Sequence, residues 1–226
     1  MIENVRNHID GIDLVVFDLD GTLVDSRLDI SEAIHHGIRT VNGPPVSDDA
    51  VHELIGLPLV EMFETLLPDA LTQRVEVAAE AYRQYYFDHC ADHSSVYPGV
   101  IECLDYLGNI PLAIATTKMT FMAVQVVEKL DLADRFVLVQ GSDGIPHKPD
   151  PTLLHQVLRK VGMEPGRTWM VGDTVYDIQA GKAAGMQTCA VTYGIGDPDE
   201  LRRVKPDSVL DNLTDFRAVT LNDKKI

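Results

Sequence analysis

Two short stretches of the chain carry pairs of acids at close spacing. Asp18 and Asp20 directly follow the apolar run LVVF. Asp173 and Asp177 follow a second apolar run, TWMVG. Carboxylates gathered in one cleft cannot all stay ionised without a cation beside them, and hard oxygen ligands select Mg²⁺ or a similar ion. The two stretches therefore predict a metal site if the fold brings them together.

Hydroxyl groups and a lysine follow the ends of other apolar runs. Thr116 and Thr117 come at the end of the run LAIA, and Lys148 lies a few residues beyond the run FVLVQ. Thr22 lies just after the first pair of acids. A metal ion, a lysine and hydroxyl groups together form a local anion site, even in a chain with a net charge of −16. This combination points to a phosphorylated ligand.

The apolar runs themselves predict the scaffold that would position these groups. Each run is continuous rather than alternating, which is typical of strands buried on both faces in a parallel sheet. Helical patterns separate the later runs, so we expect an α/β fold with a Rossmann-like, doubly wound parallel sheet. In such sheets, ligands bind outside the carboxyl ends of the strands. The predicted strands are Leu14–Phe17, Leu112–Thr116, Phe136–Gln140, Thr168–Gly172 and Thr188–Thr192.

The long segment between the first two strands interrupts this alternation. Residues 26–93 are rich in helical patterns and too long for one crossover connection, so we expect a small helical cap domain inserted into the core. The core domain would then comprise residues 1–25 and 94–226. We expect the first cap helix over Asp29–Val41, with Asp29 or Ser31 as its N-cap. Further helices should start near Ser47 and Pro58, and a long one should end near Cys90.

Composition limits the partners and the compartment. The acidic charge argues against nucleic acids and anionic membranes, because both are polyanions. Three scattered cysteines form no disulfide pattern or metal motif, and they fit a reducing compartment. No apolar run is long enough for a membrane helix, and the first residues lack a signal-peptide pattern, so we expect a cytoplasmic protein. The oligomeric state stays open.

Four motifs occur in a familiar order. The sequences DLDGTLVDS, the strand end at Thr116, KPDP and GDTVYD resemble the signature motifs of the haloacid dehalogenase superfamily. The insert sequence IGLPLVEMFETLLP is similar to the cap of the phosphoglycolate phosphatase-like branch. The resemblance implies a Mg²⁺-dependent phosphatase acting on a small phosphomonoester, such as a phosphoglycolate-like compound, a sugar phosphate or a nucleotide. The reaction would pass through an aspartyl-phosphate.

The same resemblance implies a role for each motif residue. Asp18 would be the nucleophile and a metal ligand, and Asp20 would be the general acid and base, with its backbone carbonyl on the metal. Asp173 would complete the metal site. The remaining roles would be phosphate binding for Thr116, Thr117 and Lys148, and orientation of metal waters or Lys148 for Asp177, with Thr22 in a supporting position. Many relatives carry Asn where this chain has Thr117, and Lys118 would be a positioning or a surface residue.

Substrate choice and reaction type leave alternatives open. Gly56 in the cap loop could approach the leaving group, and Arg27 could either reach an anionic substrate tail or lie on the surface near the hinge. A phosphomutase would usually carry Arg where this chain has Leu59, and an inorganic pyrophosphatase of the same fold is a further alternative. Asp20 argues against a dehalogenase or a phosphonate hydrolase. A phospho-receiver or a binding protein without catalysis would lack turnover, and a receiver is about half this length.

Overall fold

The computed structural model describes residues 11–222, and expectations for residues 1–10 and 223–226 lie outside that range. At the centre is a six-stranded sheet in which every neighbouring pair is parallel. The predicted α/β fold class is confirmed. In spatial order the strands are β5 (Leu138–Gln140), β4 (Leu112–Ala115), β1 (Leu14–Phe17), β6 (Thr168–Gly172), β7 (Gln187–Val191) and β8 (Ser208–Leu210).

The two edges of the sheet differ from the sequence prediction. β5 begins at Leu138 rather than Phe136, because Phe136 still closes a 3₁₀ turn over Ala133–Arg135. β5 is also only partly buried, since it has a single neighbouring strand. The sequence analysis missed β8, which has three residues and forms the other edge. Continuous burial is therefore a property of the central strands.

Alternate residues of β1 face opposite sides of the sheet, as the pleat requires. Leu14 and Val16 pack against one layer of helices, while Val15 and Phe17 pack against the other. Both layers are apolar, which explains the unbroken apolar run. The helices around the sheet are α5 (Val100–Leu107), α6 (Thr120–Lys129), α7 (Thr152–Val161), α8 (Val175–Ala183), α9 (Pro198–Arg203) and α10 (Phe216–Asn222).

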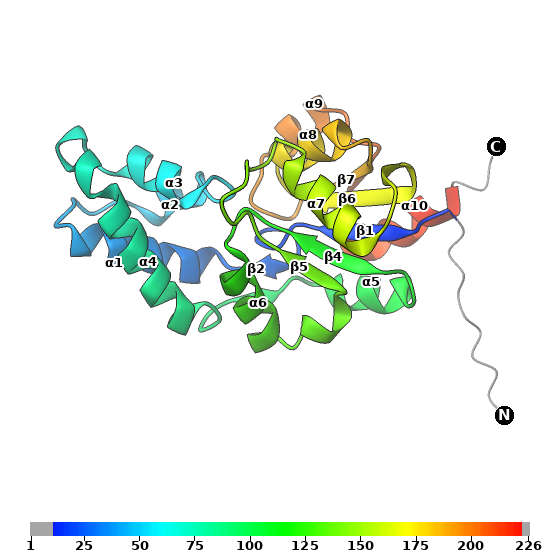
Figure 1. Cartoon of the computed structure of the whole chain (residues 1–226), viewed down its shortest axis with the longest axis horizontal. Coiled ribbons are helices and arrows are strands. Elements are labelled where there is room, and N and C mark those ends of the chain that lie inside the picture. The colour runs from blue at the N-terminus through cyan, green and yellow to red at the C-terminus, as the bar shows by residue number, and fades with distance from the viewer. Residues whose placement is uncertain (1–10, 223–226) are drawn as a thin grey trace.

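The helices of residues 26–93, the helical insert, gather beyond one end of the sheet (Figure 1). The longest pair, α1 and α4, pack against each other, and α3 packs against α4. The predicted long last helix is divided into a 3₁₀ segment and an α-helix. The insert comprises α1 (Arg27–Thr40), α2 (Asp48–His52), α3 (Leu59–Leu66), η1 (Asp69–Arg74) and α4 (Val75–His89).

The predicted N-cap of the first insert helix is wrong. α1 begins at Arg27, so Ser26 occupies the N-cap position and both Asp29 and Ser31 lie inside the helix. Asp29 instead accepts hydrogen bonds from the backbone N–H groups of His93 and Ser94 and from the Ser94 hydroxyl. A buried carboxylate inside a helix is satisfied here by a segment that returns more than sixty residues later.

Two short strands join the insert to the sheet. β2 (Val24–Asp25) leaves the core and β3 (Ser95–Val96) returns to it, and they pair antiparallel with Val24 opposite Val96. Together with Asp29, this pairing fixes the two connecting segments to each other. None of the helices in residues 11–222 is long and apolar enough to cross a membrane. All three cysteines are free and buried.

Candidate active site

The strand register brings the predicted motif residues to one edge of the sheet. Phe17 pairs with Ile114 on one side and with Val171 on the other. The chain therefore leaves β1, β4 and β6 at the same level, and the backbone N–H of Asp18 still donates to the Val171 carbonyl at 2.9 Å. β4 and β6 flank β1 and belong to the two halves of the sheet, so this edge is the expected ligand crevice.

Lys148 joins the first and last acidic motifs. Its Nζ donates to Asp18 Oδ1 at 2.7 Å, to Asp177 Oδ1 at 2.5 Å and to the Ala115 carbonyl at 3.0 Å. The lysine side chain is only 3% exposed. Burial alone lowers the pKa of Lys148, but the carboxylates of Asp177 and Asp18 outweigh that effect and raise it. The lysine is therefore a fixed positive charge.

One ammonium group does not balance the acids around it. Oxygens of Asp18, Asp173 and Asp177 lie within 4.8 Å of one another, and all three residues are buried. Burial, followed by the nearby Asp177, raises the pKa of Asp173 to about 6, and burial also raises the pKa of Asp18 against the opposing effect of Lys148. A cluster with this excess of negative charge and hard oxygen ligands fits a divalent cation such as Mg²⁺.

Asp173 is held by groups from two distant loops. Its Oδ1 accepts from the Thr22 hydroxyl at 2.9 Å, and its Oδ2 accepts from the Ile195 backbone N–H at 2.8 Å. Gly21 has a φ of +85°, and a Cβ there would lie 2.2 Å from Asp173 Oδ2. Only glycine permits this turn and this approach. The supporting position predicted for Thr22 is thus a direct hydrogen bond to Asp173.

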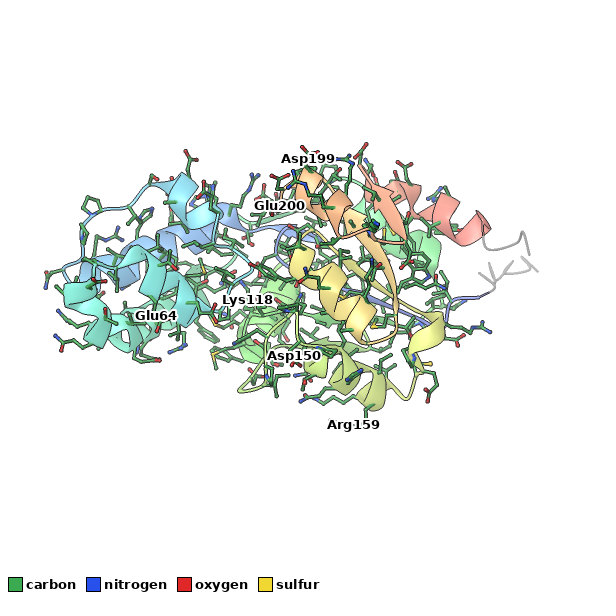
Figure 2. The ribbon with its side chains drawn as sticks, turned by 90° about the horizontal axis from the view of Figure 1, so that it is seen from above. Glu64, Lys118, Asp150, Arg159, Asp199 and Glu200 are labelled. Atoms are coloured by element: carbon green, nitrogen blue, oxygen red, sulfur yellow. The ribbon has the colours of Figure 1, made fainter. Side chains whose placement is uncertain are left out.

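Asp20 lies beside this cluster and has its own partners. Ser26 Oγ donates to Asp20 Oδ1 at 2.5 Å, and Lys118 Nζ lies 3.0 Å from Asp20 Oδ2. Lys118 is buried and also donates to the hydroxyl of Tyr86 on α4 at 2.9 Å, so the surface alternative for Lys118 is wrong. Figure 2 shows Lys118 where the insert meets the sheet domain. Sequence analysis assigned no role to Ser26, although it ends the motif DLDGTLVDS, or to Tyr86, which lies outside the motifs.

The remaining motif residues lie close to these groups. Asp177 holds Lys148 with one oxygen and, with the other, accepts from the Thr174 backbone N–H at the start of α8, so it also caps that helix. Thr116 is buried, and its Oγ1 accepts from the Lys118 backbone N–H at 3.2 Å. Thr117 is half-buried beside it and lines the adjoining cavity.

A cavity of about 390 Å³ adjoins Asp20 between the insert and the sheet domain. Gly56 lines it with a φ of +106°, and a Cβ at this position would lie 3.4 Å from Thr174 of the core. The loop therefore turns sharply and approaches the core closely, as its glycine predicts. Arg27 is not among the lining residues, and its guanidinium donates to both oxygens of Asp25 at 2.8 and 2.6 Å.

Comparisons with known proteins agree on one family. Residues 15–191 match the family model described as haloacid dehalogenase-like hydrolase. The chain is 34% identical to a probable phosphatase IndB of Dickeya dadantii, covering 89% of this chain and 90% of that protein. It is also 34% identical to a phosphoglycolate phosphatase of Agrobacterium fabrum, covering 92% and 90%. The crystal structure of a predicted phosphoglycolate phosphatase from Haemophilus somnus superposes with a TM-score of 0.86 at 27% identity, covering 94% and 100%.

Proposed function

The chain belongs to the haloacid dehalogenase-like hydrolase family, and on this basis we propose that it is a Mg²⁺-dependent phosphatase of small phosphomonoesters. It is a phosphoric monoester hydrolase of the phosphoglycolate phosphatase-like type. The observation that carries the proposal is the buried set of Asp18, Lys148, Asp173 and Asp177 at the crevice of the sheet.

In the first step, a carboxylate oxygen of Asp18 attacks the phosphorus atom. A bond forms between that oxygen and phosphorus, and the bond between phosphorus and the leaving oxygen breaks. Asp20 donates its proton to the leaving oxygen, so the product departs as an alcohol. Ser26 and Lys118 hold the two oxygens of Asp20 in place for this transfer.

In the second step, a water molecule attacks the aspartyl-phosphate. Asp20, now ionised, takes a proton from the water while a new oxygen–phosphorus bond forms and the bond to Asp18 breaks. Inorganic phosphate is released, and Asp20 is protonated again. Lys148 and the hydroxyls of Thr116 and Thr117 would bind the phosphoryl oxygens in both steps. The transition states would be stabilised mainly by positioning of the reacting groups and by opposite charge.

The side chains of Asp18 and Asp173 and the backbone carbonyl of Asp20 would hold Mg²⁺. When bound, the ion supplies positive charge that offsets the carboxylates and polarises the phosphoryl oxygens. Asp177 keeps Lys148 oriented through its short hydrogen bond. Asp173 is already fixed by Thr22 and Ile195, so the ligand is preorganised.

The helical insert would act as a cap over this site. Its loop at Gly56 reaches the core beside Thr174, and the cavity that adjoins Asp20 is lined from both sides. We place the cap at residues 26–93 and the core at residues 1–25 and 94–226. Closure of such a cap excludes bulk water from the reacting groups.

The test is catalytic release of inorganic phosphate from p-nitrophenyl phosphate, with Mg²⁺ and then with excess EDTA. We expect turnover only with the metal, and loss of about 10⁴-fold or more in Asp18→Asn, since that variant removes the nucleophile. Asp199→Asn is the matched control, because it makes the same chemical change on the exposed surface of α9 (Figure 2).

Other outcomes would favour the alternatives. Turnover that persists in EDTA or in Asp18→Asn would overturn the mechanism. A single burst of p-nitrophenol, with the phosphoryl group retained on the protein and no turnover, would favour a phospho-receiver. No release of either product would favour a binding protein. Transfer of the phosphate to another hydroxyl of the substrate, without free phosphate, would identify a phosphomutase. Hydrolysis of pyrophosphate in preference to every monoester would identify a pyrophosphatase.

A further inference from the structure

The cavity beside Asp20 is much larger than the leaving group of phosphoglycolate. One water molecule occupies about 30 Å³ in the liquid, and at that volume for each of its five non-hydrogen atoms glycolate would fill about 150 Å³. The cavity holds about 390 Å³. A small two-carbon acid would therefore leave more than half of it to solvent. An alcohol of about 13 non-hydrogen atoms would fill it, and a nucleoside, with about 17 to 19, would fill it and extend beyond it.

The lining of the cavity is mainly apolar. Helices and loops of the insert contribute branched aliphatic side chains such as Ile55, Leu57 and Leu59. Three methionines, Met62 from the insert and Met119 and Met122 from the core, complete this surface. Methionine side chains adapt their shape and make favourable contacts between sulfur and aromatic rings. Such a surface would bind an apolar ring favourably, but it offers no group that would bind a carboxylate.

The charged groups of the lining also disfavour a carboxylate. Lys118 already forms an ion pair with Asp20 at 3.0 Å and donates a hydrogen bond to the Tyr86 hydroxyl at 2.9 Å. Glu61 projects from α3 and has no ion-pair partner among residues 11–222. Asp143 also lines the cavity and accepts from the Thr120 backbone N–H at 2.9 Å. An anionic leaving group would meet these two acids, while both cations of the lining, Lys118 and Arg83, are already paired with acids.

Two hydrogen-bonding side chains at the cavity are incompletely used. The Nε of Arg83 and the Nδ1 of His147 are buried without a hydrogen-bond partner. The guanidinium of Arg83 forms an ion pair with Glu80, with 3.3 Å between Nη1 and Oε2. Burial lowers the pKa of His147, against the opposing effect of Glu61, so its ring is neutral near pH 7. Small shifts of these side chains would let them bond to the heteroatoms of a polar ring.

We propose that the enzyme prefers phosphomonoesters whose leaving alcohol is uncharged, carries a ring and has at least about 13 non-hydrogen atoms, as a nucleoside does. Phosphoglycolate and similar small acids are then poor substrates. This inference rests on the proposed function, because it concerns the leaving group at the same site. The geometry that carries it is the large apolar cavity between insert and core, with Glu61 and Asp143 at its wall.

The first experiment compares kcat/KM for phosphoglycolate, glycerol phosphate and adenosine 5′-monophosphate with Mg²⁺. We expect adenosine monophosphate to exceed phosphoglycolate by about tenfold or more, since even one extra methylene in an apolar pocket is worth about 10- to 200-fold. Glycerol phosphate, which is small and uncharged in its leaving group, should fall between them. Preference for phosphoglycolate would overturn the inference and leave the proposed phosphatase intact.

The second experiment changes the cavity itself. Glu61→Lys should shift the ratio of kcat/KM toward phosphoglycolate by about tenfold, because an acid facing the substrate is replaced by a cation. Glu76→Lys is the matched control, since it changes the total charge equally at the start of α4, the end of the helix that lies far from the core (Figure 1). Equal shifts in both variants would show an effect of overall charge and overturn the inference.

A third variant tests size separately from charge. Leu59→Trp should reduce the cavity and lower kcat/KM for adenosine monophosphate more than for phosphoglycolate, about tenfold in their ratio. Val77→Trp adds the same ring to an exposed position of the cap that does not line the cavity. An unchanged ratio in a folded Leu59→Trp protein would overturn the inference. Absence of turnover with every substrate, p-nitrophenyl phosphate included, would remove the proposed function and this inference with it.

Discussion

The two sides of the candidate site are built in different ways. On the sheet side, Asp18, Asp173 and Asp177 are buried and hydrogen-bonded to fixed partners in the core. On the insert side, the cavity is lined by apolar residues, a glycine and an exposed acid, and the polar groups there have few partners. In the proposed function these are two separate tasks: the sheet edge would carry out the chemistry, whereas the insert face would set which molecule is recognised.

The largest effect should come from breaking the sheet side at Lys148. Lys148→Met leaves the buried carboxylates of Asp18 and Asp177 without their ammonium partner, and breaking a buried ion pair costs about 3–5 kcal/mol. We expect a similar loss in the free energy of unfolding and a fall in kcat of at least about 10²-fold. Urea unfolding and phosphate release measure the two effects. A kcat within a few-fold of the original would mean that Lys148 does not act on the phosphoryl group.

The second prediction concerns the pH dependence of stability without metal. The pKa of Asp173 is raised to about 6 from an unfolded value near 3.8, so the folded protein binds a proton more tightly. Its contribution to the free energy of unfolding is full below about pH 4 and is lost as the pH rises through 6, by about 3 kcal/mol. Urea unfolding in EDTA between pH 4 and 7 measures this. Asp173→Asn should lack that part of the slope.

The same unfolding measurement can be made with saturating Mg²⁺ in place of EDTA. Because a cation at Asp18 and Asp173 favours the ionised carboxylates, it should stabilise the protein more at pH 7 than at pH 5. Equal stabilisation by Mg²⁺ at both values would argue against these two acids as its ligands.

A smaller effect should come from the insert side at Gly56. Its φ of +106° is costly for any residue with a Cβ, so Gly56→Ala should lower the free energy of unfolding by about 1–3 kcal/mol. We expect KM to change more than kcat, because the loop lines the cavity and does not contact Asp18 or Asp173. Gly166→Ala is the control, since its added Cβ would meet nothing within 4 Å. A fall confined to kcat would place Gly56 with the sheet side instead.

The smallest effect should follow removal of Arg27. Its pair with Asp25 is substantially exposed, and exposed ion pairs contribute about 0.2–1 kcal/mol. Arg27→Ala should therefore lower stability by at most about this amount and leave the order of preferred substrates as it was. A reordering of substrates in that variant would assign Arg27 to recognition and would extend the recognising surface as far as the hinge.

The same contrast explains what sequence analysis could predict. Asp18 and Asp173 follow strands whose apolar runs identify them locally, so the sheet side could be assembled from motifs. Asp29 was misplaced as a helix cap because its partners, His93 and Ser94, return from a distant part of the chain. Lys118 was ambiguous because its environment depends on Tyr86 of the insert.

The edges of the sheet and the cavity could not be predicted from the sequence, because they also depend on contacts between distant parts of the chain. β5 starts late because Phe136 closes a 3₁₀ turn, and β8 is a three-residue strand at the sheet edge; the apolar runs record neither. The cavity depends on how the insert rests on the core. Its apolar residues have the same pattern as residues of an ordinary helical core, so their positions indicate burial but not a pocket.

The paired connections β2 and β3 set how the insert can move. Val24 lies opposite Val96, and Asp29 binds the backbone just before β3, so the outgoing and returning chains behave as one double-stranded joint. Such a joint resists sliding and twisting, because either would separate its two strands. Bending about the joint is the remaining freedom. Bending at this joint would carry the Gly56 loop and Glu61 together relative to Asp20, because both belong to the insert beyond the joint.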